Sequence, residues 1–437
     1  MSLSRRKFLV GCSTAVAAMS GGRIGQMVFA GERSQAQLAG TDEILVVLFC
    51  RGGWDALSLV SPFDDAIYNE KRSSLALEKP ITIDPSNSSF SSSIGLHPQA
   101  APLAELYKQN SMAIVHACGL NNDTRSHFEA MDYIERGTPG NKSTASGWLT
   151  RHLQLVGEEG TIPTISSGAA IPASLLANPN AIALNSLESY GLSSDWRYNH
   201  DENQALFEAL KRGYAGDGAF ASTGRRTIET IESIQQLKNQ NEDDFDYVPK
   251  PNLKYPYPSD GSGRDLSGSL QTIAHTIKLD LGLRVATVDF GGWDTHEGQG
   301  TNGGYFADLV DGLSRNLHAF YNDLSDYWGK LTVVVMSEFG RRLGENTSGG
   351  TDHGHGNIML TFGGNVNGGK IYGAWPGLED LDQDQDLKIT TDFRTILGEV
   401  VSKRLGNPEL GKVFPGLTQE TYQPLGLVKG NPGTIIF

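Results

Sequence analysis

Hydrophobic and polar positions along this chain alternate in blocks that predict strands and helices in turn. Residues 43–50 form a continuous apolar run rich in β-branched side chains. Such runs are typical of strands covered on both faces, as in a parallel sheet. The same reasoning predicts further strands at 112–117, 283–290, 331–336 and 358–362, and helices at 98–109, 126–136, 265–281, 305–327 and 392–404. This alternation predicts an α/β fold with a doubly wound, mostly parallel sheet.

The middle of the chain follows a different pattern. Residues from about 160 to 262 hold short apolar pieces, two polar helical segments near 202–213 and 222–240, and an acidic loop rich in proline and tyrosine. We interpret this region as a helical insertion with little core of its own. The rest of 42–437 is then one large α/β domain.

Polar residues gather where the predicted strands end. Ligands bind at the carboxyl ends of strands in open α/β sheets, because the loops leaving those ends line a crevice. The first strand leads through two glycines to Asp55, which is either a ligand or the cap of a following helix. The strand at 283–290 leads to Asp294 and His296, which can aim at one ion from a glycine-stiffened turn.

The glycine-rich loop at 349–356 is the strongest candidate for contact with a metal or an anion. It carries Asp352, His353 and His355 but no apolar residue to bury, so packing is a poor explanation for them. An ordinary surface loop is the alternative. Mixed carboxylate and imidazole ligands favour Zn²⁺ or Mn²⁺, with Ca²⁺ and Mg²⁺ as further possibilities.

The predicted helix at 126–136 opens with a capping-box pattern in which Ser126 is the cap and Glu129 its partner. A hydroxyl at a helix N-terminus lies beside free N–H groups and the positive end of the helix dipole. That position stabilises an anion. Ser126 is therefore a candidate nucleophile as well as a cap.

The net charge of −14 over 437 residues excludes nucleic acid and anionic membrane surfaces as expected partners, because phosphate groups require a basic footprint. Of the three cysteines, Cys12 lies in the N-terminal segment, and Cys50 and Cys118 end apolar runs. We expect both of these to be buried thiols rather than a disulfide scaffold.

Residues 1–30 are typical of a twin-arginine export signal. Arg5 and Arg6 lie in a basic start, and a small-residue cleavage pattern ends at Ala30. The apolar run between the basic start and Ala30 is too short for a stable membrane span. Cys12 in this run also matches a lipidation box, but we favour a cleaved export signal over lipidation. Residues 31–41 are a polar linker. We expect the mature chain to be periplasmic or secreted, with the Tat translocase as its partner during export.

Taken in order, the motifs resemble the domain-of-unknown-function family 1501, whose members are often exported by the twin-arginine route. That family is similar to the alkaline phosphatase and sulfatase superfamily, which implies an alkaline-phosphatase-like fold. Enzymes of the superfamily use two metal sites and a Ser or Thr nucleophile on phosphate or sulfate esters. The matching segments are residues 51–55, 125–128, 147–149, 291–296, 336–341, 351–356 and 372–377.

The resemblance implies roles for individual residues. Ser126, or in second place Thr124, falls at the nucleophile, and Arg125 and Arg341 would neutralise charge on the substrate. Glu338 stands where the superfamily has an Asp-His pair, so Phe339 replaces one imidazole, and one of the two metal sites lacks a ligand. The metal ligands implied are Asp55, Asp294, His296, Glu338 and either His353 or His355, with His355 preferred.

These features predict an exported, metal-dependent hydrolase that acts on a small anionic phosphate or sulfate ester. The sulfatase nucleophile motif Cys/Ser-x-Pro-x-Arg is missing, which argues against a type I sulfatase. The alternative is a non-catalytic binding or assembly protein of the cell envelope on a degenerate alkaline-phosphatase-like fold. The replacement at Phe339 favours that alternative.

Overall fold

The computed structural model describes residues 41–83, 93–168, 170–191, 200–240, 245–256 and 266–437, together with residues 38 and 90. The predicted signal peptide at 1–30 lies outside these residues, and the predicted linker at 31–41 falls within them only at positions 38 and 41. Within the described ranges, no helix combines the length and the apolar character needed to cross a bilayer.

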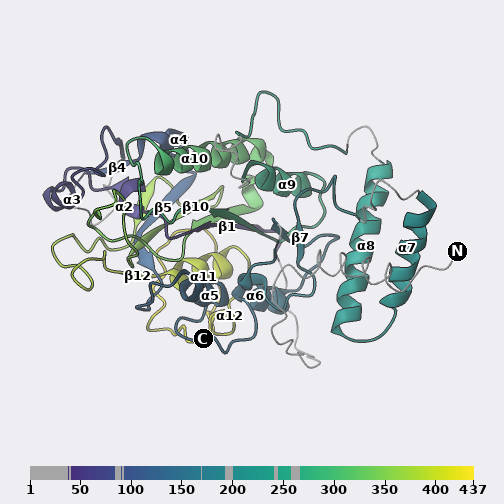
Figure 1. Ribbon diagram of the computed structural model, residues 1–437. Coiled ribbons are helices and arrows are strands. Elements are labelled where there is room, and N and C mark those ends of the chain that lie inside the picture. The colour runs from purple at the N-terminus through teal and green to yellow at the C-terminus, as the bar shows by residue number, and fades with distance from the viewer. Residues whose placement is uncertain are drawn as a thin grey trace.

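A mixed, mostly parallel sheet forms the centre of the molecule (Figure 1). In the described part of the chain its order is β11-β5-β10-β9-β1-β8-β6-β7, and β12 also pairs with β5. Its strands are β1 (Ile44–Arg51), β5 (Met112–Gly119), β6 (Thr164–Ser167), β7 (Ile182–Leu184), β8 (Val285–Gly291), β9 (Leu331–Met336), β10 (Asn357–Gly363), β11 (Lys370–Tyr372) and β12 (Thr391–Asp392).

The strand β10 runs against the direction of the rest of the sheet. It is antiparallel to both of its neighbours, β5 and β9, whereas the other described pairs of this sheet are parallel. Its seven residues are all buried, as the apolar run at 358–362 predicts. A buried run looks the same in either direction, so the sequence pattern carried no sign of this reversal.

Helices cover both faces of the sheet, which confirms the doubly wound α/β prediction (Figure 1). One hydrophobic core takes Val46 and Leu48 of β1, and the other takes Val47 and Phe49, so β1 is buried on both sides. The first core is covered by α4 (Ala101–Lys108), α9 (Leu266–Lys278) and α10 (Tyr305–Asp323); the second is covered by α5 (His127–Arg136), α6 (Trp148–Val156), α11 (Phe393–Lys403) and α12 (Leu410–Val413).

The predicted insertion at about 160–262 begins too early. β6 and β7 fall within that range, yet they pair in parallel with each other and with β8 as part of the central sheet. These strands have only four and three residues, too few for a clear hydrophobic pattern. The helical part of the insertion follows β7: α7 (His200–Gly213) and α8 (Ala219–Gln240) form a pair to one side of the sheet (Figure 1).

Most of the smaller elements lie outside the helices and strands predicted from the sequence pattern. A short antiparallel sheet in the order β2-β4-β3 follows β1, and two brief helices lie beside it. The bounds of the smaller elements are β2 (Val60–Ser61), β3 (Ile81–Ile83), β4 (Ile94–Leu96), α2 (Ala56–Leu59), α3 (Ala66–Lys71), η1 (Pro98–Ala100), η2 (Ala173–Leu175) and η3 (Ser325–Lys330).

The structure also confirms Cys50 and Cys118 as buried free thiols.

Candidate metal site

The carboxyl ends of β1, β8 and β9 bring the candidate site together at one edge of the sheet. β1 lies between β8 and β9 and is parallel to both, so the loops that leave the three strands are neighbours. Gly52, with a φ of +122°, lets two of these loops touch, since a Cβ there would lie 2.5 Å from the backbone nitrogen of Asp294. The backbone N–H of Gly52 also donates to Oε1 of Glu338, at 2.8 Å.

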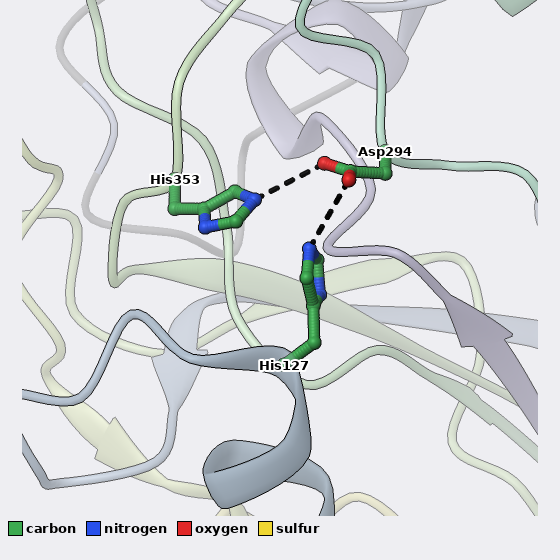
Figure 2. Close-up of side chains that lie close together, drawn as sticks. All are labelled: His127, Asp294 and His353. Carbon is green, nitrogen blue, oxygen red and sulfur yellow. Dashed lines mark hydrogen bonds and ion pairs between the residues drawn. The ribbon is translucent and has the colours of Figure 1, made fainter.

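Three imidazoles converge on the carboxylate of Asp294, whose side chain is 46% exposed. Nε2 of His353 and Nε2 of His296 each lie 3.1 Å from Oδ1, and Nε2 of His127 lies 3.4 Å from Oδ2. The two nitrogens of His296 and His353 are themselves 2.8 Å apart. Figure 2 shows His127 and His353 approaching Asp294 from different elements; one ligand atom from each of these three residues lies within 4.8 Å of the others.

The other nitrogen of each ring, Nδ1, is held by an oxygen that accepts a hydrogen bond. A backbone carbonyl can only accept, and ionised carboxylates likewise only accept. Each ring therefore carries its proton on Nδ1, and its Nε2 lone pair points toward Asp294 in the neutral form. The pairs are His127 with Oε1 of Glu338 at 2.8 Å, His296 with Oδ1 of Asp352 at 3.0 Å, and His353 with the carbonyl oxygen of Arg125 at 2.8 Å.

This arrangement fits a metal cation. Lone pairs of His296 and His353 that face each other at 2.8 Å, beside a carboxylate, repel unless a proton or a cation lies between them. Nε2 of His127 is buried without a hydrogen-bond partner, which is costly unless something binds it. Ligand atoms around a tetrahedral Zn²⁺ lie about 3.4 Å apart. The distances around Asp294 are close to that value.

The electrostatics of the site agree with this donor set. Burial lowers the pKa of His353, so its Nε2 is available near neutral pH. Burial would raise the pKa of Asp294, but the hydrogen bond and charge of Arg341 outweigh it and lower that pKa to about 2. Burial would lower the pKa of His127, but the hydrogen bond and charge of Glu338 raise it above its ordinary value. A cation at the site therefore competes with a proton for Nε2 of His127.

Arg341 lies behind Asp294 and not in the open part of the site. The residue is 1% exposed. Its guanidinium donates to Oδ1 of Asp294 at 2.6 Å, and its remaining hydrogen bonds go to backbone carbonyls, including those of Gly53 and Thr351. The prediction that Arg341 holds a substrate oxyanion is wrong, because its donors are already used inside the protein. Its role is to hold and neutralise Asp294.

Asp55 does not join the cluster around Asp294. Its Oδ2 accepts hydrogen bonds from Nη1 of Arg72 at 2.5 Å, Oγ of Ser58 at 2.6 Å and Nε2 of Gln299 at 2.8 Å, and both ion-pair partners are completely buried. Asp55 is the N-cap residue of α2 without making a side-chain cap bond. The prediction of a metal ligand is corrected: Asp55 is half of a buried structural ion pair.

Glu338 and His355, predicted as metal ligands, also do not contact Asp294. Glu338 is fully buried and reaches the cluster only through His127. His355 is buried and bonds through Nδ1 to Oδ2 of Asp382 at 2.6 Å. Of the two late histidines it is His353 that faces Asp294, so the preference for His355 is corrected.

The three candidates before α5 differ in how their side chains are engaged. Oγ1 of Thr124 donates to the side chain of Glu129 at 2.9 Å and accepts from the backbone N–H of Ser126 at 3.2 Å, so the capping box predicted for Ser126 and Glu129 does not form. Ser126 occupies the N-cap position with no side-chain cap bond. Arg125 is partly exposed, and its guanidinium bonds Asp386 at 2.5 Å and Gln383 at 2.9 Å.

Sequence reasoning missed His127 as a candidate ligand. The signal was present, because His127 lies next to Ser126 in a motif already singled out, at the start of a predicted helix. The structure places it as the first residue of α5, with its ring over Phe339 at a centroid distance of 4.8 Å. The centroid of the Phe339 ring also lies 4.7 Å from that of His353, so one apolar ring packs against both imidazoles.

A family model described as a protein of unknown function, DUF1501, matches residues 97–402. This range contains all the residues that converge on Asp294. The chain belongs to the DUF1501 family. No curated protein matches the sequence of this DUF1501 member.

Solved structures show only distant similarity to this DUF1501 chain. They include an alkaline phosphatase from the Antarctic bacterium TAB5, with 10% identity, a TM-score of 0.29, and 73% of this chain and 91% of that chain covered. The C-terminal periplasmic domain of EcEptC from Escherichia coli has 10% identity and a TM-score of 0.35, over 91% and 94% of the two chains. The PsFucS1 sulfatase from Pseudoalteromonas sp. has 11% identity and a TM-score of 0.33, over 99% and 78%. None of these values is high enough to transfer an activity.

Proposed function

We propose that this DUF1501 protein is an exported, metal-dependent hydrolase of phosphate or sulfate esters. The observation that carries the proposal is the convergence of three Nε2 atoms on one partly exposed carboxylate, each ring fixed through Nδ1. Imidazoles with a carboxylate favour Zn²⁺ or Mn²⁺ over Ca²⁺ or Mg²⁺. A divalent ion held by Asp294, His353 and His127, with His296 beside them, would polarise the ester and lower the pKa of the attacking hydroxyl or water.

The surrounding residues keep the cluster in its binding form. Glu338 and Asp352 orient His127 and His296, and the backbone of Arg125 orients His353. Carboxylates and carbonyls in this position raise the basicity of a metal-binding imidazole and hold its tautomer. Arg341 keeps Asp294 ionised from behind, where it does not obstruct the substrate.

Ser126 is the proposed nucleophile. Its hydroxyl makes no cap bond, and it precedes His127 at the N-terminus of α5, where backbone N–H groups and the helix dipole stabilise an alkoxide and a bound oxyanion. Thr124 is the weaker candidate because its hydroxyl is donated to Glu129. Arg125 is the proposed source of local positive charge for an anionic ester; Nη2 of its guanidinium is paired with Asp386, and the side chain is partly exposed.

The proposed setting is the periplasm or the exterior of the cell. The twin-arginine pattern at 1–30 supports export with the Tat translocase as a transient partner. The proposed substrate is a small anionic ester. The acidic net charge argues against nucleic acid as a partner.

A second candidate function is non-catalytic binding in the cell envelope. Two observations favour it: Arg341 already occupies Oδ1 of Asp294, and the buried ring of Phe339 stands beside two of the three histidines. An apolar ring supplies no ligand for a second ion. Such a protein would bind an anion at the cluster without turning it over.

Turnover by the metal-loaded mature chain distinguishes the two functions. The chain without residues 1–30 is loaded with Zn²⁺ or Mn²⁺ and assayed with p-nitrophenyl phosphate and p-nitrophenyl sulfate. We expect hydrolysis that falls at least about a thousandfold in Ser126→Ala, since loss of a nucleophile removes most of the catalysis. Thr124→Val is the matched control and keeps most of the activity. Bound metal with no turnover across a panel of esters would reject the hydrolase and favour the binding protein.

A further inference from the structure

Phe128 is exposed to an unusual degree for its position. It is 81% exposed, the highest value among the large hydrophobic residues that the structure describes. It directly follows His127 in the first turn of α5, at the end of the helix that faces the metal cluster. An aromatic ring left in water at this point gains free energy from any apolar group that covers it.

The flank of α5 that carries Phe128 can be identified from the helix period. Seven residues make almost two turns, so Phe128 and Glu135 lie on the same flank. Glu135 is buried, bonds Arg51 at 2.7 Å and accepts a hydrogen bond from the backbone of Ala173 in η2. Glu135 therefore faces η2, whereas Phe128 lies about 10 Å nearer the N-terminal end of the helix. Ile171, two residues before η2 begins, is itself 38% exposed.

We propose that Phe128, one residue after the candidate ligand His127, forms an apolar subsite beside the metal cluster. It binds the aromatic or otherwise apolar alcohol portion of the ester, while the cluster binds the anionic portion. This inference rests on the proposed function and names its substrate class: esters of phenols or bulky hydrophobic alcohols rather than of small polar alcohols. Stacking on an aromatic ring adds to the gain from burying apolar area.

Matched variants test the subsite. Phe128→Ala removes the proposed platform, and Phe220→Ala removes another exposed phenylalanine, 56% exposed on α8 in the insertion. The readout is the affinity of phenylphosphonate relative to methylphosphonate for the metal-loaded protein, measured by calorimetry. We expect the phenyl ligand to bind the wild type about tenfold or more tightly than the methyl ligand. Phe128→Ala loses most of that ratio, Phe128→Leu keeps part of it, and Phe220→Ala leaves it unchanged.

Binding of the phosphonates separates the subsite from the hydrolase. If no ester is turned over but the phenyl preference depends on Phe128, the subsite stands and the proposed hydrolase activity fails. If esters are hydrolysed but aryl and methyl esters show the same ratio of kcat/KM in the wild type and in Phe128→Ala, the hydrolase stands and the subsite is rejected. A wild type that does not prefer phenylphosphonate, or does not bind it, also overturns the subsite.

Discussion

The same tetrapeptide follows or ends β1 and β8, but its aspartate has a different role in each place. Residues 52–55 and 291–294 both read Gly-Gly-Trp-Asp, and their tryptophans meet edge to face at 5.7 Å. Asp55 is completely buried against Arg72, whereas Asp294 is half exposed, with Arg341 behind it and three imidazoles in front. One tetrapeptide thus gives a structural ion pair in one loop and a candidate metal site in its neighbour.

The difference comes from what the following chain brings to each carboxylate. After Asp55 the chain forms α2 and α3 and returns Arg72 and Ser58 to the same oxygen, so no open face remains. After Asp294 the chain continues into a loop that carries His296. Identical local sequences therefore take their roles from tertiary neighbours.

The largest expected effect is a loss of free energy of unfolding when Asp55, in the first of the two loops, is replaced. Asp55→Asn leaves the buried charge of Arg72 without its partner, and breaking a buried ion pair costs about 3–5 kcal/mol. We expect the variant to bind a divalent ion as the wild type does, because Asp55 does not contact the cluster. Urea unfolding and elemental analysis on the same preparation check both statements. Loss of metal without loss of stability would place Asp55 in the site instead.

Acid titration of the wild type sharpens this prediction. Burial would raise the pKa of Asp55, but the charge and hydrogen bond of Arg72 outweigh it and lower that pKa below the ordinary value of 3.8. A lowered folded-state pKa gives stability that is present above the ordinary value and is lost as the pH falls through the folded value. The pair therefore holds at neutral pH and weakens only in strong acid, and Asp55→Asn lacks this part of the acid dependence.

A smaller effect is expected at the carboxylate that orients His127. Glu338→Gln keeps the size of the side chain but removes its charge, and we expect zinc affinity to fall about 10–100-fold, as for other partners of metal-binding histidines. Titration against a competing chelator measures the change. Glu345→Gln is the control, since Glu345 bonds Ser73 and Ser74 away from the cluster. Equal affinities for Glu338→Gln and the wild type would contradict the orienting role.

Strong hydrophobic runs made much of the fold predictable. The strand predicted at 331–336 has those bounds in the structure, and the first strand differs by one residue at each end. Both are continuous buried runs, for which burial alone specifies a strand. β6 and β7 were missed because a strand of three or four residues is too short to show a period, and the direction of β10 depends on its neighbours in the sheet.

The site was predictable only in part. Asp294, His296 and His353 were named from their loops, and the structure brings them together. Asp55 was misplaced because its partner Arg72 lies 17 residues further on, where no local pattern connects the two. His127 was passed over because a polar residue at the start of a helix is usually solvated, and only the tertiary fold turns it toward Asp294.

Metal content tests the central claim most directly. Elemental analysis of the purified chain without residues 1–30, after dialysis against metal-free buffer, is compared for the wild type, Asp294→Ala and Asp55→Asn, with circular dichroism to verify folding. We expect one tightly bound divalent ion per chain in the wild type and in Asp55→Asn, and none in a folded Asp294→Ala. A wild type that binds no divalent ion when Zn²⁺ or Mn²⁺ is supplied, or a folded Asp294→Ala that retains it, would contradict the account.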